Sequence, residues 1–208
     1  MKNILDYALS MTEDEPALLQ RLHRDTHQKV LYPRMLSDHY QGRLLALLSK
    51  LIRPKRILEI GTFTGYSCIC LAEGLAEGGE IHTLEMNSEL GFIIFPYLEE
   101  AGIADQVHVH FGKALDTLPT IKGEFNMVFI DADKGNYLNY YKMIIDQVPS
   151  GGLILGDNVW WDGKVLSEAF HDKESVGIRE FNAFVRKDER VEKVFLPIRD
   201  GLFLLRKK

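Results

Sequence analysis

The sequence has only two cysteines, and it lacks an excess of either charge. Cys68 and Cys70 stand two positions apart, so on a helix their side chains point in different directions and cannot readily share a disulfide or a metal ion. We expect two thiols in the core. The 30 acidic and 25 basic residues are mixed along the chain and leave a net charge of −5. This balance provides no broad basic surface for nucleic acid.

Long apolar runs and linkers are also missing. No stretch approaches the roughly 18 apolar residues of a membrane span, and the N-terminus reaches acidic residues before any run long enough for a signal peptide. We therefore expect a cytoplasmic protein with no membrane partner. No low-complexity tract, linker or repeat interrupts the 208 residues. This continuity favours one domain over residues 1–208, with N-terminal helices at about 1–52.

Helical and strand patterns alternate through most of the chain. Apolar residues at helical spacing predict two helices near the N-terminus, at 14–30 and 37–52. Short apolar runs that end at glycine or polar residues then predict strands at 56–61, 80–86, 106–112, 126–131 and 151–158, with helical segments at 66–76, 88–102 and 136–148. This alternation is typical of a parallel sheet with helices on both faces.

The C-terminus departs from the alternation. The runs "VEKVFLPI" and "GLFLLR" are separated only by Arg199 and Asp200, with Gly201 at the junction, which predicts a hairpin. The last two strands should therefore be antiparallel. The expected fold class is α/β, with a doubly wound, mostly parallel seven-stranded sheet that ends in an antiparallel β-hairpin.

A glycine loop follows the first predicted strand. Gly61 and Gly65 stand four positions apart, whereas the nicotinamide fingerprint would place a further glycine where Phe63 stands. No Lys-Ser or Lys-Thr pair follows, so a phosphate-binding P-loop is excluded as well. A nucleoside without phosphates needs only close backbone approach and a carboxylate for its ribose, which Glu85 could supply at the end of the second strand. The alternative is a tight turn beside a solvated Glu85.

Polar side chains end the fourth and fifth predicted strands. Asp131 closes one, while Asp157 and Asn158 close the other, and neighbouring parallel strands would bring them together. Two carboxylates and an amide suit a hard divalent cation such as Mg²⁺, with Mn²⁺ or Ca²⁺ as substitutes. A calcium loop starting at Asp131 is excluded, since Asn136 replaces its glycine and Lys142 its glutamate. The alternatives are a helix cap at Asp131 and a turn at Asp157.

Lys134 lies three residues beyond Asp131 and should face the same pocket. A partly buried lysine beside a metal-bound hydroxyl can accept a proton, although a lysine in a loop is commonly just solvated. His108 and His110 share one face of the third strand, and we interpret them as structural because no other soft ligand stands nearby in the sequence.

Four motifs in order, "EIGTFTGYS", "DADKGNY", "GDNVWWDGKV" and "LPIRDGLFLLRK", resemble the cation-dependent O-methyltransferases that use S-adenosylmethionine. This group contains the caffeoyl-CoA and catechol O-methyltransferases, and the resemblance is closer to the caffeoyl-CoA type and its bacterial relatives. It runs from about Met35 to the C-terminus. It implies a Rossmann-like class I methyltransferase fold, S-adenosylmethionine and Mg²⁺ as cofactors, a small aromatic diol as substrate, and a homodimer.

By position, the resemblance also implies roles for individual residues. The metal ligands fall on Asp131, Asp157 and Asn158, and the proposed general base falls on Lys134. The expected contacts to S-adenosylmethionine fall on Glu59, Gly61, Tyr66, Ser67, Glu85, Ala114 and Asp131. One position departs from the plant members, because Gln41 replaces a glutamate of their pattern. A plant-like substrate preference therefore does not follow.

The implied reaction transfers a methyl group from the sulfonium of S-adenosylmethionine to one oxygen of a vicinal aromatic diol. The cation would lower the pKa of the diol, and Lys134 would take its proton. Trp160 and Trp161 could pack against the aromatic ring. Two alternatives stay open: a metal-independent methyltransferase, which would not need Asp157 and Asn158, and a non-enzymatic nucleoside-binding module.

Overall fold

The computed structural model describes residues 4–208, and these residues form a seven-stranded sheet in the order β3-β2-β1-β4-β5-β7-β6. The first five strands are parallel, whereas β7 runs antiparallel to both β5 and β6. The predicted fold class and the C-terminal hairpin are confirmed. The strands are β1 (Arg56–Ile60), β2 (Glu80–Glu85), β3 (Val107–Phe111), β4 (Met127–Ile130), β5 (Leu153–Asp157), β6 (Val191–Leu196) and β7 (Leu202–Lys207).

The predicted helices are all present, although each is shorter than its sequence pattern. α6 and α8 were not predicted from the sequence, whereas α1 lies within the region of about 1–52 for which N-terminal helices were predicted. Within residues 4–208, no helix combines the length and the apolar character that crossing a bilayer requires. The α-helices are α1 (Ile4–Ser10), α2 (Ala17–Lys29), α3 (His39–Ile52), α4 (Tyr66–Ala72), α5 (Gly91–Glu100), α6 (Ala114–Thr117), α7 (Tyr137–Ile144) and α8 (Lys173–Lys187).

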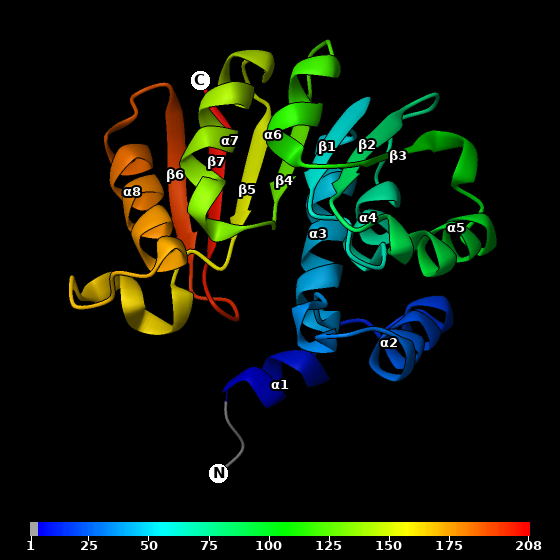
Figure 1. The fold of residues 1–208 in the computed structure, drawn as a ribbon. Helices are drawn as coiled ribbons and strands as arrows, with labels where there is room; N and C mark the ends of the chain where they lie inside the picture. The colour runs from blue at the N-terminus through cyan, green and yellow to red at the C-terminus, as the bar shows by residue number, and fades with distance from the viewer. Residues whose placement is uncertain (1–3) are drawn as a thin grey trace.

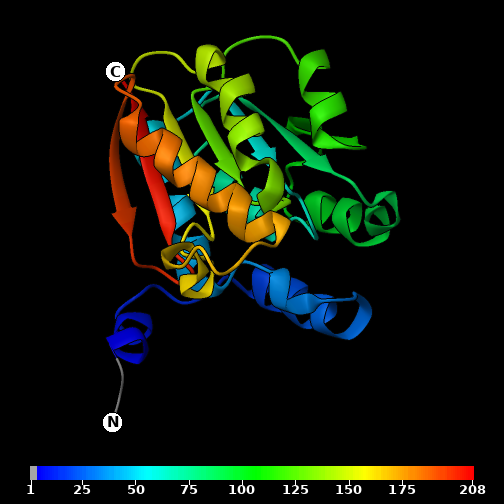
Figure 2. The same ribbon diagram turned by 60° about the vertical axis from the view of Figure 1, so that its left-hand side comes forward.

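Two apolar layers lie on opposite faces of the sheet. Ile57 of β1 packs with side chains of α2, α3, α4 and α5, whereas its neighbour Leu58 packs with side chains of α7 and α8. Figure 1 shows α7 and α8 in front of the sheet and α3 behind it, and Figure 2 shows α8 alongside α7. Because the central strands are covered on both faces, they read as continuous apolar runs. Cys68 and Cys70 are buried and unpaired, which confirms the expected core thiols.

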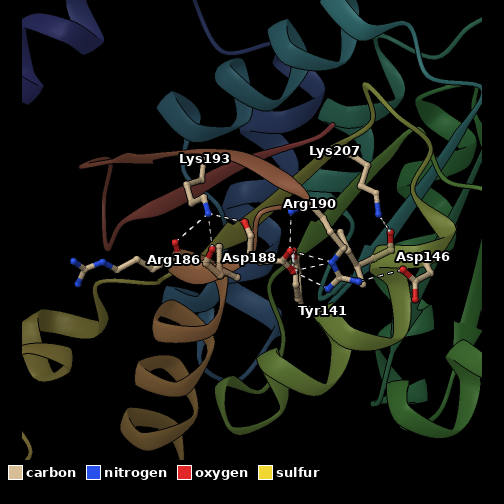
Figure 3. A network of polar contacts seen from close by, with 9 residues as sticks. Tyr141, Asp146, Arg186, Asp188, Arg190, Lys193 and Lys207 are labelled. Carbon is tan, nitrogen blue, oxygen red and sulfur yellow. Dashed lines mark hydrogen bonds and ion pairs between the residues drawn. The ribbon is translucent and has the colours of Figure 1, made fainter.

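A polar network fixes the C-terminal hairpin to the helices beside it (Figure 3). The Lys193 ammonium on β6 donates to the carbonyl oxygens of Val185, Arg186 and Asp188, at 3.0, 3.1 and 2.7 Å, where α8 ends. The last carbonyl groups of a helix lack donors four residues further along, so the lysine caps the end of α8, where Val185 also accepts from the Asp188 backbone N–H at 3.1 Å. The Asp188 carboxylate accepts from Tyr141 of α7 and is paired with Arg190 at 2.7 Å. The network holds β6, α7 and α8 together.

The first helix is set apart from this core. None of its residues is buried, and Ile4 and Tyr7 are 87% and 64% exposed. In Figure 1, α1 lies below the sheet, near the start of α3. Exposed apolar side chains of this size are typical of surfaces that contact other molecules.

Candidate active site

The carboxyl ends of β4 and β5 bring the predicted metal ligands to one place. These strands are parallel neighbours, and Ile130 is paired in register with Gly156, so Asp131 and Asp157 follow at adjacent strand ends. The Asp157 side chain is buried, and that of Asp131 is 18% exposed. Asn158 comes next, with a left-handed φ of 56° that turns the chain sharply out of β5. The predicted adjacency of the two strand ends is confirmed, and the ligand roles of Asp131, Asp157 and Asn158 stay predictions.

Lys134 joins this group through an ion pair. Its ammonium donates to Asp131 Oδ1 at 2.7 Å and to the Tyr137 hydroxyl at 2.9 Å, and the residue is only 8% exposed. The interpretation of Lys134 as a solvated loop side chain is therefore wrong. Asp131 pairs with Lys134 and is not the residue that caps the next helical segment. That segment begins with the turn η5 (Lys134–Asn136), whose N-cap is Asp133.

Tyr137 connects the two strand ends, and the sequence analysis did not assign it a role. Its hydroxyl oxygen lies 3.1 Å from the carbonyl oxygen of Ile130 and 2.9 Å from that of Asp157, while it accepts from Lys134. A hydroxyl has one proton, so it donates to one carbonyl at a time. The tyrosine thereby links the last residue of β4, the last residue of β5 and the buried ammonium.

The charged form of the Asp157 carboxyl lies in an unfavourable electrostatic environment. Burial, followed by the nearby charge of Asp131, raises the pKa of Asp157 to about 6. Its Oδ1 accepts from the Asn158 backbone N–H at 2.9 Å, but its Oδ2 is buried without a hydrogen-bond partner among residues 4–208. Buried carboxylate oxygens normally have partners, and two adjacent carboxylates repel each other. These residues therefore fit a hard divalent cation, which would be bound by Asp131, Asp157 and Asn158.

Gln41, in the first turn of α3, lines this site. It is 1% exposed, and its Oε1 accepts from Arg199 Nη1 at 2.5 Å. Its Nε2, which like Asp157 Oδ2 is buried without a hydrogen-bond partner among residues 4–208, faces Asp157 and opposes the rise in the pKa of that carboxyl. Arg199 stands in the turn between β6 and β7, and it also donates to the Leu36 carbonyl oxygen at 3.1 Å. The residue that departs from the plant pattern thus contacts the hairpin directly. In Figure 1 the hairpin turn and the start of α3 both lie below the sheet.

The glycine loop brings β1 close to β4. Gly61 has a φ of 107°, and a Cβ atom at this position would lie 1.9 Å from the carbonyl oxygen of Asp131. Only glycine fits such an approach. On the other side of the loop, the Glu85 carboxylate accepts from the backbone N–H groups of Phe63 and Asn87, both at 2.8 Å. Glu85 is therefore a fixed acceptor at the end of β2 and not a freely solvated side chain.

The other expected cofactor residues occupy three different surroundings. Glu59 is fully buried, and its oxygens accept from Ser67 at 2.6 Å and Thr83 at 2.5 Å, while burial raises its pKa to about 7. Tyr66 directs its hydroxyl to Glu15 Oε1 at 2.5 Å. Ala114 begins α6. The structure thus brings Glu59 and Ser67 into contact, and the cofactor roles of all these residues stay predictions.

Two aromatic residues follow the expected ligands. Trp160 is 40% exposed, and Trp161 is partly buried at the start of the turn η7 (Trp161–Leu166). The amide N–H of Trp160 donates to the Asp200 carbonyl oxygen at 2.8 Å, so the segment is bound to the β6–β7 turn. Packing of either ring against an aromatic substrate stays a prediction.

Comparisons with known proteins identify the family of the chain. The family model described as O-methyltransferase matches residues 9–208. Caffeoyl-CoA O-methyltransferase 1 of Eucalyptus globulus is 36% identical, covering 99% of this chain and 87% of that protein. Caffeoyl-CoA O-methyltransferase 2 of Petunia hybrida is 37% identical, covering 98% of this chain and 88% of that protein.

Solved structures show the same fold with the cofactor bound. The O-methyltransferase TomG from Streptomyces achromogenes, involved in tomaymycin synthesis and solved with S-adenosylmethionine, has a TM-score of 0.91 and 31% identity, covering 99% of this chain and 96% of that one. An O-methyltransferase from Bacillus cereus in complex with S-adenosylhomocysteine has a TM-score of 0.90 and 31% identity, with 97% and 96% covered. The chain therefore belongs to the O-methyltransferase family and is an S-adenosylmethionine-dependent O-methyltransferase.

Proposed function

We propose that this enzyme methylates one hydroxyl of a vicinal aromatic diol, of the catechol or caffeoyl type, and that it requires a divalent cation, with Mg²⁺ expected. The observation that carries the proposal is the buried, unpartnered Oδ2 of Asp157 next to the carboxylate of Asp131. The names of the caffeoyl-CoA relatives support the class of acceptor.

A bound divalent cation would lower the pKa of a diol hydroxyl, which is otherwise a weak nucleophile at neutral pH. Lys134 is the group proposed to receive the proton. Lys134 is an ammonium that donates to Asp131 at 2.7 Å, so this ion pair must open and Lys134 must release a proton to solvent before it can act as a base. A cation held by Asp131 would compete with the ammonium for this carboxylate, while the Tyr137 hydroxyl would still position the lysine nitrogen.

S-adenosylmethionine is expected at the glycine loop. Glu85 accepts two backbone hydrogen bonds and retains lone pairs on both oxygens, which suits it to the ribose hydroxyls. Gly61 allows the backbone of the loop to lie against Asp131, so the proposed cofactor and cation sites are contiguous. Such contiguity is what in-line methyl transfer demands, because the diol oxygen must approach the methyl carbon closely. Glu59, Tyr66, Ser67 and Ala114 complete the proposed contacts.

One observation favours the metal-independent alternative. Lys134 already provides a positive charge beside Asp131 without any metal. If this ammonium sufficed, the enzyme would methylate a more acidic hydroxyl with no added cation. The unpartnered Asp157 oxygen is unexplained by that alternative, so we favour the metal-dependent reaction.

The proposal is tested with chelated enzyme, S-adenosylmethionine and a simple catechol. Methylation should disappear in chelator and return with Mg²⁺, and Asp157→Asn should weaken this activation while S-adenosylmethionine still binds in calorimetry. Asp116→Asn is the matched control, because Asp116 is an exposed carboxylate at α6. Full activity in chelator, with no metal found on analysis, would overturn the cation requirement.

We also propose that the enzyme is a cytoplasmic homodimer. Exposed apolar side chains on α1 and α3 support the dimer, with Leu47 55% and Leu51 72% exposed on α3. Sedimentation at micromolar concentration should give twice the 23.8 kDa mass of the chain, and a monomer would contradict the proposal.

A further inference from the structure

A group of imidazoles and a carboxylate lies on the two strands at one edge of the sheet. β2 and β3 are parallel neighbours, with His82 paired in register with His108 and Leu84 with His110. Alternation along the strands places Glu80, His82, His108 and His110 on one face. This is the face covered elsewhere by α7 and α8. The group lies toward the start of β2, whereas Glu85 and the proposed active site lie at its end.

The group is accessible from solvent. The side chains of His108, Glu80 and His82 are 48%, 36% and 12% exposed. His82 also packs edge-on against Phe125, so one side of the group is apolar and fixed while the other side is open. A cation could enter here without any rearrangement of the core.

Distances within the group resemble those of a metal site. Glu80 Oε1 lies 3.1 Å from His82 Nε2, and Glu80 Oε2 lies 3.2 Å from His108 Nε2. One potential ligand atom from each of the three residues lies within 4.8 Å of the other two. Ligands bound tetrahedrally at about 2.1 Å from Zn²⁺ are about 3.4 Å apart. The half-exposed His108 needs only a modest movement to complete this geometry.

The present hydrogen bonds at His82 conflict with one another. Arg56 Nη2 lies 2.7 Å from His82 Nε2, the same nitrogen that faces Glu80 Oε1 at 3.1 Å. A guanidinium can only donate and a carboxylate can only accept, so one ring nitrogen cannot satisfy both. If Nε2 accepts from Arg56, its lone pair and that of Glu80 both face the guanidinium, because Arg56 Nε also donates to Glu80 Oε1 at 2.6 Å. A metal cation bound by both lone pairs would take the place of this guanidinium.

A second imidazole orients the first. His82 Nδ1 lies 3.0 Å from His110 Nε2, so an Nδ1–H tautomer of His82 donates to His110 and leaves Nε2 free as a ligand. Histidine ligands commonly donate their other ring N–H to such a partner. Burial lowers the pKa values of His82 and His110, which favours the neutral imidazoles that metal binding requires.

We propose that Glu80, His82 and His108 form a second cation site, selective for a borderline transition ion such as Zn²⁺, with His110 as the residue that orients His82. Imidazole ligands distinguish it from the all-oxygen site proposed at Asp131 and Asp157. Arg56 occupies the position in the absence of the ion and competes with it. A bound ion would join β2 to the edge strand β3.

The test is a titration of the full-length protein with Zn²⁺ in calorimetry, with Mg²⁺ present in excess to occupy the all-oxygen site. The wild type should bind one Zn²⁺ and become more resistant to heating, and Co²⁺ in its place should give the strong visible absorption of tetrahedral coordination. His82→Ala/His108→Ala should lose all three signals. His171→Ala, which removes an exposed imidazole outside the group, should keep them.

Two further variants separate this site from general surface binding. Arg56→Gln should bind Zn²⁺ more tightly, because the competing positive charge is gone, and His110→Ala should bind it about tenfold more weakly or worse. Circular dichroism and S-adenosylmethionine binding check folding. If the double variant fails to fold, His108→Ala alone carries the test at a half-exposed position. Equal Zn²⁺ binding by the wild type and the histidine variants, or no binding by the wild type, would overturn the proposal.

Discussion

Replacing Lys134 by methionine removes the buried ammonium while keeping a side chain of similar length. The lysine nitrogen has two partners in the structure, Asp131 Oδ1 at 2.7 Å and the Tyr137 hydroxyl at 2.9 Å. Removing one member of a buried ion pair costs about 3–5 kcal/mol. The Asp131 side chain is still 18% exposed, so the lower end, about 3 kcal/mol, is expected for the protein without a cation.

The loss of stability should depend on the cation. In chelator, Lys134→Met leaves the charges of Asp131 and Asp157 without the nearby ammonium. The free energy of unfolding should then fall by about 3 kcal/mol. With saturating Mg²⁺ the fall should be smaller, because the ion compensates both carboxylates. Cation affinity should not decrease, since an ammonium that competes for Asp131 has been removed.

Activity should respond differently from stability. If Lys134 is the base, turnover with saturating Mg²⁺ and S-adenosylmethionine should fall about 10²- to 10⁴-fold at neutral pH. The deficit should shrink at alkaline pH, where the diol ionises without help. The assay is the turnover of a simple catechol across this pH range. Lys142→Met is the matched control, because Lys142 is an exposed lysine on α7 that packs over Phe184 at 5.2 Å.

Two results would refute this reasoning. Wild-type turnover by Lys134→Met at every pH would mean that the lysine only balances charge beside Asp131. A loss of S-adenosylmethionine binding in calorimetry would mean that the lysine organises the whole site, and the fall in turnover could not then be assigned to proton transfer.

Three other perturbations test separate parts of the site. Glu85→Ala should weaken S-adenosylmethionine binding by about 1.5–3 kcal/mol in calorimetry, and an unchanged dissociation constant would place the ribose elsewhere. Glu59 has a pKa raised to about 7 in the fold, so the native state binds more protons than the unfolded state, and stability should fall as pH rises from about 4.5 to 7. Urea unfolding at several pH values should show a smaller fall in stability for Glu59→Gln. The same pH dependence in the wild type and the variant would contradict the raised pKa of Glu59. Gly61→Ala should destabilise by more than about 2 kcal/mol because its Cβ would meet the Asp131 carbonyl, whereas Gly78→Ala, with open space, should cost about 1 kcal/mol.

The sequence was sufficient to predict the strand ends that meet. β4 and β5 are apolar throughout and then turn polar at once, at Asp131 and Asp157, and side-by-side ends are a property of parallel strands. The hairpin was equally predictable, because Gly201 stands between two apolar runs. Its φ of 83° in the structure agrees with a turn at this position. In both cases the signal is local, and a general rule of sheet architecture supplies the long-range contact.

Contacts between distant segments were not predictable in this way. Gln41 and Arg199 are 158 positions apart, and nothing near either residue indicates the other. Tyr137 is only three positions after Lys134 in the sequence, but an apolar helix pattern explains a tyrosine there without any polar role. Its bridge between the ends of β4 and β5 depends on the exact position of α7 over the sheet.

Helix α8, which was not predicted from the sequence, shows why such positions escape a local pattern. α8 contains Gly177, which weakens helix propensity by about 1 kcal/mol relative to alanine. A Cβ at Gly177 would lie 2.6 Å from the carbonyl oxygen of Lys134 and 2.7 Å from Cα of Gly135. The glycine that obscures the helix in the sequence therefore lets its backbone pack directly on the turn that carries Lys134. α8 covers that turn, so a lysine four residues beyond the end of β4 is buried against Asp131 instead of extending into water.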